Sequence, residues 1–363
     1  MEVSRYYIDG GRFGKGEIVS NLSRREFAKV AAAGSLTAAA LATASITPAL
    51  GQFPGRTPPP EEAPASLPDG SAMGLEIYTV RDQAAKDLEG TIRQVAAIGY
   101  KEVEPIDFGG LTPKQYRALM DKYGLTAISG HTECAPGPDL EKTLEGMQIM
   151  GLKYTWVTAP RRPRPTTPPA RSAVRRPPAA ETPDSVKRTV DTYNQVGQVA
   201  KKYGIQVLVH NHAMEFEKFP RSEQCPYDII LSESDPATVV MQMDIGWASV
   251  AGQDPIAMFQ KNPGRFVLWH VKDFMNLQYL FPQPEMTERQ RMSVAGHWMV
   301  PVSLGGIDYK AIFAHAKLAG MKHFAIEQDN AYTWGDSIAA ARVCYHGLLR
   351  ELAAPDTKTP EVS

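Results

Sequence analysis

Two histidines lie one residue apart at the end of an apolar run in the stretch "VLVHNHAMEFE", residues 207–217. Residues i and i+2 of a strand face the same side, so His210 and His212 are expected to point together while Asn211 points away. Imidazoles bind divalent metals and exchange protons near neutral pH. The stretch therefore predicts a site for a metal or for acid/base chemistry at the end of a strand.

A repeated order of helix, glycine and short strand surrounds this stretch. Apolar residues at helical spacing, such as Leu88, Ile92, Val95 and Ile98, precede glycines, and Thr112 with Pro113 has the form of a helix start. β-rich runs follow Gly99, Gly124, Gly151, Gly204 and Gly320. With "GLEIYTV", "TVVMQMDIG" and "RFVLWHVKD" they give eight strands, from about Leu75, Val103, Ala127, Tyr154, Val207, Val240, Val267 and Phe324. This pattern predicts an α/β fold of the (β/α)8 TIM barrel type.

The ends of these strands carry most of the polar side chains that could do chemistry. Active sites of (β/α)8 barrels lie where the strands end. Six of the eight predicted strands end in a possible ligand or acid/base group: Glu104, His131, His210 with His212, Asp244, His270 and Glu327. One such residue alone could be structural, but their coincidence predicts an active site. No glycine-rich nucleotide fingerprint follows the first strand, which disfavours a dinucleotide-binding fold.

These motifs resemble a known superfamily. "VHNHAMEFE", "QMDIGW", "LWHVKDF", "SLGGIDYKAIF" and "AIEQD" are similar to the sugar phosphate isomerase/epimerase superfamily of xylose isomerase-like TIM barrels, over roughly residues 73–352. The resemblance implies a divalent metal held by strands five to eight, and Asp244, His270 and Glu327 match three of its ligands. His210 stands where epimerases have a glutamate, a form that resembles inosose dehydratase-like and keto-glycoside-processing members.

Two imidazoles and two carboxylates, from His210, Asp244, His270 and Glu327, make a mixed nitrogen and oxygen site. Such a site suits Mn, Co, Zn or Fe rather than Ca, with Mg kept open. A metal there would polarise a substrate carbonyl while a base removes the adjacent proton. Glu327 is expected to be ligand and base together, and His212, Glu215 or Glu104 to supply the acid. The residues expected to bind substrate are His131, Lys272, Trp247 and Trp298.

The sequence leaves several functions open. The leading one is a metal-dependent isomerase or epimerase acting on an unphosphorylated sugar or ketosugar. Alternatives are a lyase or dehydratase acting on a keto-inositol or a 3-keto-glycoside, an endonuclease IV-like phosphodiesterase, and a sugar-binding protein without catalysis. Hydrophobic content of 43%, charged content of 22% and a net charge of -1 indicate a small neutral partner rather than nucleic acid. A homo-oligomer remains possible.

The N-terminal segment, residues 1–51, resembles a twin-arginine (Tat) signal. "SRREFAK" at residues 23–29 matches that motif, and an alanine-rich run without charges follows. Cleavage near Gln52, use of the Tat export machinery and a periplasmic or secreted protein are expected. A membrane anchor is the alternative.

The remaining segments define the domain boundaries. Residues 52–72 are expected to be a proline-rich linker, 73–355 the barrel and 356–363 a tail. Residues 159–184, with six arginines and many prolines, are expected to be a disordered insert, or else a lid or anion-recruiting arm. The long connection 274–303 is expected to be an ordered cover over the site. Three cysteines provide no disulfide framework, and no catalytic role is expected for them.

Overall fold

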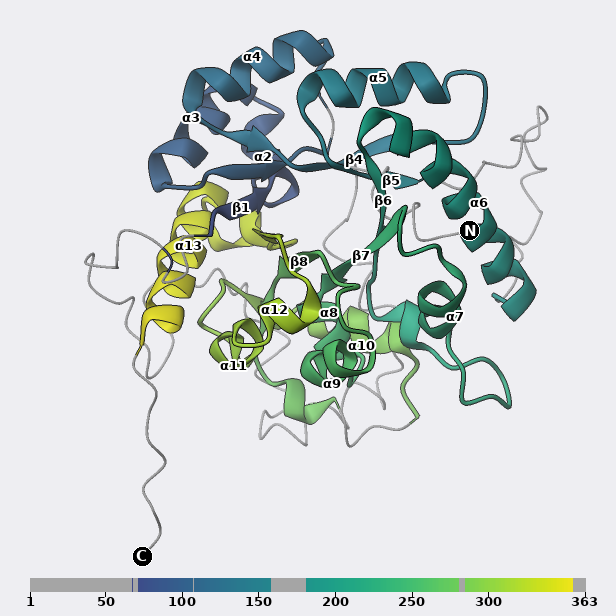
Figure 1. Ribbon diagram of the computed structural model, residues 1–363. Helices are drawn as coiled ribbons and strands as arrows, with labels where there is room; N and C mark the ends of the chain where they lie inside the picture. Colours follow the sequence, from purple (N-terminus) through teal and green to yellow (C-terminus); the bar gives the residue numbers. More distant parts are fainter. Residues whose placement is uncertain (1–66, 68–70, 107, 158–180, 281–284, 355–363) are drawn as a thin grey trace, which may run out of the picture.

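Nine strand segments form one parallel sheet that curls into a barrel (Figure 1). The computed structural model describes residues 67, 71–106, 108–157, 181–280 and 285–354, apart from the side chains of residues 131–133. The strands are β1 (Met73–Glu76), β2 (Glu102–Glu104), β3 (Thr126–Ala127), β4 (Ser129–Cys134), β5 (Tyr154–Val157), β6 (Gln206–His210), β7 (Val239–Asp244), β8 (Leu268–Val271) and β11 (His323–Ile326).

The sheet order β3-β2-β1-β11-β8-β7-β6-β5-β4 confirms the expected barrel. Eight strands are expected, and the extra segment arises because the third is divided at Ile128 into β3 and β4. The chain itself thus joins the two ends of the sheet. The expectation that this strand ends at His131 is wrong, because β4 continues to Cys134.

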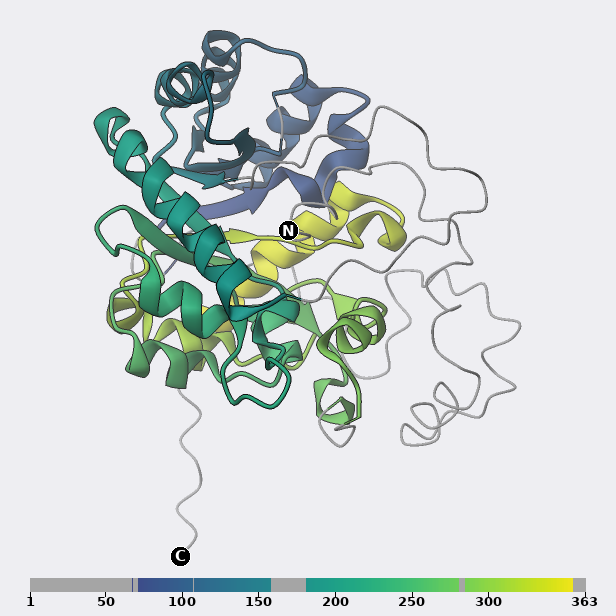
Figure 2. The ribbon, with the colours of Figure 1, turned by 90° about the vertical axis from the view of Figure 1, so that its right-hand side faces the viewer.

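Helices surround the strands, as two views at right angles show (Figures 1 and 2). They are α2 (Arg81–Ala84), α3 (Leu88–Ile98), α4 (Pro113–Tyr123), α5 (Leu140–Met150), α6 (Pro183–Ala200), α7 (Pro226–Glu233), α8 (Ile245–Val250), α9 (Pro255–Lys261), α10 (Glu288–Ala295), α11 (Tyr309–Phe313), α12 (Ala316–Ala319) and α13 (Ser337–Ala353). Single 3-10 turns are η3 (Ile77–Val80), η4 (Lys201–Tyr203), η5 (Met214–Phe216), η6 (Leu277–Tyr279) and η7 (Ala331–Trp334).

Local sequence explains where these helices begin and end. Thr112 and Gln115 cap α4 reciprocally, with Pro113 as the first helical residue. Gly124 ends the same helix in the left-handed conformation, which glycine adopts without steric cost. Thr182 caps α6 in the same way, so this helix begins at Pro183. The end of the expected insert, at Asp184, is therefore placed too late.

Alternation along the strands sorts side chains into two sets. Val209, Met243, Trp269 and Phe324 belong to the main apolar cluster, which also contains the inward faces of the helices. The alternate residues form the barrel interior, where a separate apolar cluster holds Ile128, Tyr154, Leu208, Val240, Val267 and Leu268. Two residues further along their strands come His210, Gln242 and His270, so the apolar cluster forms the floor beneath these polar side chains.

The connection after β8 is ordered over its described part. It contains η6, α10 and β10 (Met299–Val300), which pairs antiparallel with β9 (Asp273–Phe274). Trp298 is half-buried and packs in a small cluster with Trp247, Phe274 and Met299. An ordered cover is therefore present beside the carboxyl end of the barrel, although residues 281–284 lie outside the described part.

Several expectations concern the edges of the domain. Leu67, inside the expected linker, is buried in the main apolar cluster, so this part of the segment contacts the barrel. Cys134, Cys225 and Cys344 are buried and none forms a disulfide. Residues 1–51, most of the insert and the tail 356–363 lie outside the described residues. Within the described residues, none of the helices has the length and apolar character needed to cross a membrane.

Candidate metal centre and active site

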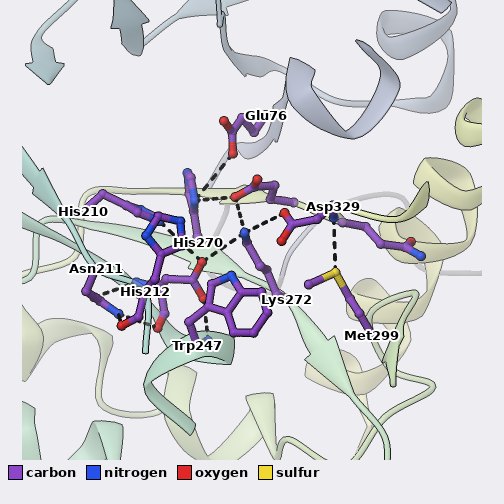
Figure 3. A network of polar contacts seen from close by, with 12 residues as sticks. Glu76, His210, Asn211, His212, Trp247, His270, Lys272, Met299 and Asp329 are labelled. Carbon is purple, nitrogen blue, oxygen red and sulfur yellow. Dashed lines mark hydrogen bonds and ion pairs between the residues drawn. The ribbon is translucent and has the colours of Figure 1, made fainter. Parts of the chain in front are cut away.

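The four expected metal ligands meet in the barrel interior. His210 and Asp244 end β6 and β7, His270 lies in β8, and Glu327 directly follows β11. All four are buried, with at most 5% of their surface exposed. His210 Nε2 lies 3.7 Å from Asp244 Oδ2, and His270 Nδ1 lies 2.8 Å from Glu327 Oε2. The ring centres of His210 and His270 are 4.7 Å apart (Figure 3).

Their ligand atoms form two overlapping groups. His210, Asp244 and His270 offer atoms within 4.8 Å of one another, as do Glu76, His270 and Glu327. His270 belongs to both groups, so it is the centre of the constellation. Mixed imidazole and carboxylate donors at this separation fit a borderline divalent cation after a small contraction.

A chain of hydrogen bonds holds both imidazoles from behind. Gln242 Oε1 lies 3.1 Å from His210 Nδ1, and Gln242 Nε2 donates to Glu104 Oε2 at 2.8 Å. Glu104 Oε2 also lies 3.0 Å from His270 Nε2. The other two ring nitrogens, His210 Nε2 and His270 Nδ1, are directed at carboxylates, so they are the atoms that a metal would take. Metal-ligating histidines are typically held by such an acceptor behind the ring.

Lys272 places a positive charge among the carboxylates. Its Nζ lies 2.7 Å from Glu327 Oε2, 2.8 Å from Asp329 Oδ1 and 3.2 Å from Asp244 Oδ2. Burial opposes the charged form, but these carboxylates raise the pKa of Lys272 above its ordinary value. The lysine thus stays an ammonium, and Figure 3 shows it directed at Asp329. It is expected to hold a substrate oxygen, and its charge suits that role.

The two histidines differ in charge. Burial lowers the pKa of His270, but the charges and hydrogen bonds of Glu104 and Glu327 outweigh this and raise it to about 10. Burial, reinforced by the charge on His270, lowers the pKa of His210 well below its ordinary value. In the metal-free protein His270 is therefore a cation, whereas His210 is neutral.

The carboxylates differ as well. Burial and the neighbouring Glu327 raise the pKa of Glu76, and burial raises that of Asp244. Burial also acts to raise the pKa of Glu327, but Lys272 and His270 hold it well below the usual range. Glu327 is accordingly the firmest anion of the cluster, and Glu76 beside it is favoured in the protonated form.

His212 and Glu215 form the other side of the site. The rings of His210 and His212 are 4.8 Å apart, as expected from their spacing in the sequence. Glu215 Oε2 accepts the backbone N–H of His212 at 2.6 Å. Burial raises the pKa of Glu215 to about 7. This side therefore combines an imidazole with a carboxyl group that titrates near neutrality.

Asn211 explains how the strand ends are fixed. Its side chain accepts the backbone N–H of Asp244 at 3.1 Å and donates to the carbonyl oxygen of the same residue at 3.2 Å. Asp244 Oδ1 in turn accepts the backbone N–H of Trp247. Asp244 Oδ2 accepts no hydrogen bond from the described residues and faces His210 and Lys272. That oxygen is the natural donor to a cation.

The other expected site residues lie in different surroundings. Glu104 is inside the barrel and supports His270 and Gln242, a position that favours a positioning role over the expected acid role. Trp247 is buried, with its ring centre 5.8 Å from Lys272 Nζ. Trp298 belongs to the cover beside it. The side chain of His131 lies outside the described part.

Sequence reasoning missed Glu76, Gln242, Asp329 and Trp156. Glu76 ends β1 as Glu104 ends β2, and the two residues pair in register, so the strand-end rule could have found it. Gln242 lies two residues before Asp244 in β7, a spacing that signals the same side of the strand, and Asp329 lies two residues after Glu327 in the turn that follows β11. Trp156 stacks on His210 with ring centres 4.8 Å apart, a contact without a local sequence signal.

Comparisons with known proteins agree with this architecture. The family model described as "Xylose isomerase-like TIM barrel" matches residues 92–344. An inosose dehydratase of Geobacillus thermodenitrificans is 27% identical over 146 residues, which are 39% of this chain and 47% of that protein. The chain thus spans about half the length of this curated relative.

Solved structures share the fold at lower identity. A sugar phosphate isomerase/epimerase from Parabacteroides distasonis superposes with a TM-score of 0.59 at 19% identity, over 81% of this chain and 99% of that one. An IOLI protein solved with a bound zinc atom gives a TM-score of 0.55 at 12% identity, over 77% and 98%. Because the family model covers more than half of the sequence, the chain belongs to the xylose isomerase-like TIM barrel family.

Proposed function

We propose that the protein is a divalent-metal-dependent isomerase or epimerase that removes the proton next to the carbonyl of an unphosphorylated ketosugar. The observation that carries this proposal is the arrangement of the two buried imidazoles. Each has one nitrogen held by Gln242 or Glu104 and the other directed at carboxylates. The zinc atom bound by the IOLI structure of the same fold is consistent with such a site.

His210, Asp244, His270 and Glu327 would hold the metal. When bound, the metal would supply a Lewis acid that polarises the substrate carbonyl and stabilises the negative charge that develops on its oxygen. Lys272, a buried ammonium, would bind and orient a neighbouring substrate oxygen. Trp247 and Trp298 would limit the access of water from the cover side.

We assign proton transfer to His212, whose backbone N–H donates to Glu215. Glu327 is the expected base, but Lys272 and His270 hold its pKa well below the usual range, and a carboxylate stabilised in this way accepts a proton poorly. His212 lies at the carboxyl end of β6, next to His210, and is fixed through its backbone by Glu215. We therefore favour metal binding for Glu327 and acid/base work for His212.

Solvent exchange tests this assignment. Metal-loaded protein is incubated in D2O with a panel of unphosphorylated ketoses and keto-glycosides, and deuterium at the carbon next to the carbonyl is measured by NMR. His212→Ala should lower the exchange rate about a hundredfold or more while keeping the metal. Glu327→Gln should lose both metal and exchange. Exchange unaffected in His212→Ala would reject the base assignment, and no exchange with any compound would favour sugar binding without catalysis.

A dehydratase is the second candidate, and the match to an inosose dehydratase favours it. Elimination starts with the same proton removal and then needs an acid to protonate the departing hydroxyl. Glu215, with its pKa raised to about 7, is suited to that step. Appearance of a conjugated enone in the ultraviolet spectrum during turnover would separate elimination from isomerisation.

Export through the Tat machinery is a separate proposal based on residues 23–29. Replacement of Arg24 and Arg25 by lysine should keep the protein in the cytoplasmic fraction. Equal distribution of the variant and the native chain between fractions would reject the export signal.

Metal analysis of the purified protein would test the phosphodiesterase alternative. Clustered metals, rather than about one per chain, would favour that alternative.

A further inference from the structure

Tyr332 presents an aromatic ring to solvent at the carboxyl end of the barrel. It is 47% exposed, and only two other large hydrophobic residues in the described part are comparably exposed, Ile149 and Leu318. Those two lie on the outer helices α5 and α12, whereas Tyr332 lies on η7, just after β11 and the site residue Glu327. An exposed aromatic ring a few residues from buried polar side chains is a candidate contact for a ligand.

Arg81 lies next to this ring in a fixed position. Its guanidinium donates to the carbonyl oxygens of Tyr78 at 2.7 Å and Asp329 at 2.8 Å. The same group stands 3.8 Å above the ring of Tyr78 and 5.1 Å from that of Tyr332. Within the described residues, the contacts of the Arg81 guanidinium are thus with backbone carbonyl oxygens and aromatic rings. Two of its five N–H donors are used in the two hydrogen bonds, so others remain for a ligand.

Asp329 connects this pair to the centre of the site. Its backbone oxygen accepts from Arg81, while its side-chain Oδ1 accepts from Lys272 at 2.8 Å. The carboxylate of Asp329 is 31% exposed, whereas Lys272 is fully buried. Asp329 thus lies between the buried cluster, which it contacts through Lys272, and the outer rings, which it contacts through Arg81.

The turn that carries Tyr332 is anchored on both sides. Ala331 and Trp334 are buried in a small cluster with Val300 and Ala340. Asn330 donates from its side chain to the backbone oxygen of Met299 at 3.0 Å, which ties the turn to the cover. The ring is therefore presented by a rigid support, which lowers the entropy cost of binding.

We propose that Tyr332, Arg81 and Tyr78 form an outer subsite, and that the substrate is a ketosugar carrying a second sugar ring. The face of a sugar ring is apolar and its rim carries hydroxyl groups, which match an aromatic face beside free N–H donors. The buried cluster would act on the keto ring while Tyr332 stacks against the second ring. This inference rests on the proposed function for its chemistry, but the subsite can be tested by binding alone.

Matched ligands test the subsite. D-fructose is compared by calorimetry with three glucosyl-fructoses, turanose, maltulose and palatinose, which keep the same keto unit and differ in the position of the second ring. Metal-loaded native protein should bind at least one of them about tenfold more tightly than D-fructose. Tyr332→Ala should remove most of this preference, about five- to tenfold, the order expected for one stacking contact. Its affinity for D-fructose should stay within about twofold.

Two further variants keep the test specific. Tyr332→Phe, which keeps the aromatic face, should retain the preference, and Leu318→Ala, an exposed apolar residue on α12, should behave as the native protein. Equal loss of affinity for D-fructose and for the glucosyl-fructoses in Tyr332→Ala, or no preference for any extended ligand in the native protein, would overturn the subsite. Preference for the extended ligand without D2O exchange would sustain the subsite and reject the proposed reaction.

Discussion

The site contains one histidine from β8, which pairs with β11, and one from the end of β6. The side chains that surround these two histidines differ in charge. Around β8 and β11, His270 and Lys272 are surrounded by Glu104, Glu327 and Asp329. At the end of β6, His210 stacks on Trp156 and bonds to the neutral amide of Gln242. The imidazole of His270 is consequently charged, whereas that of His210 is neutral. In the proposed metal site, His270 would have to lose a proton before it binds the metal, whereas His210 would not.

Loss of His270 should have the largest effect, because this ring belongs to both ligand groups. His270→Ala should lose the metal and lower turnover on the order of a thousandfold. Elemental analysis and the exchange assay provide the measurements. The control is His323→Ala, a histidine at the opposite end of β11 that bonds to Glu102, and it should keep the metal. Full metal content in His270→Ala would disprove the site.

Removing Lys272 should lower the stability of the protein, and mainly that of its metal-free form. Lys272→Met leaves three carboxylates without their cation and should lower the free energy of unfolding by about 3–5 kcal/mol. Added divalent metal should restore much of the loss, because it supplies positive charge to the same oxygens. Denaturant titration with and without metal checks this.

Lys122→Met is the control for Lys272. Lys122 pairs with Glu89 in solvent, at 60% side-chain exposure, so its loss should leave stability nearly unchanged. Equal stability of Lys272→Met and the native chain, both measured without metal, would mean that the ammonium does not balance the buried carboxylates.

Gln242 supports both histidines, and its loss should have an intermediate effect. Gln242→Leu removes the acceptor for His210 and the donor to Glu104, so metal affinity should fall about 10–100-fold. Competition with a chelator measures the affinity. Gln206→Leu, which changes the same residue type at the start of β6, should bind metal normally. Equal affinities of the two variants would argue against the supporting chain.

The change in metal affinity per pH unit should be the smallest of these effects. The pKa of His270 is raised to about 10, so its proton must leave before the ring binds a metal. Apparent metal affinity should therefore rise by about tenfold per pH unit between roughly pH 7 and 9. The metal-free protein should become less stable over the same range, because a raised histidine pKa stabilises the fold only while the proton is bound. Metal affinity that is independent of pH would mean that His270 is neutral.

The sequence predicts the barrel and the positions of most of the proposed metal ligands because both follow from periodicity. Alternation along β6, β7 and β8 puts His210, Asp244 and His270 inside the barrel, and parallel strands bring their ends together. The charge state of each group is not predictable in this way. It depends on burial and on neighbours from other strands, such as the three carboxylates around Lys272. Glu76 was missed although the same strand-end rule applies to it.

Closure of the barrel also sets the order in which the site can form. The register pairs Met73 of β1 with Phe324 of β11, so the first and last strands lie side by side. During synthesis, β1 has no partner on that side until the ribosome has made nearly the whole barrel. Glu76 cannot meet Glu327 and His270 before that moment. The buried cluster is therefore incomplete in a nascent chain until its last strand docks, and until then the open strand edges are exposed to other chains.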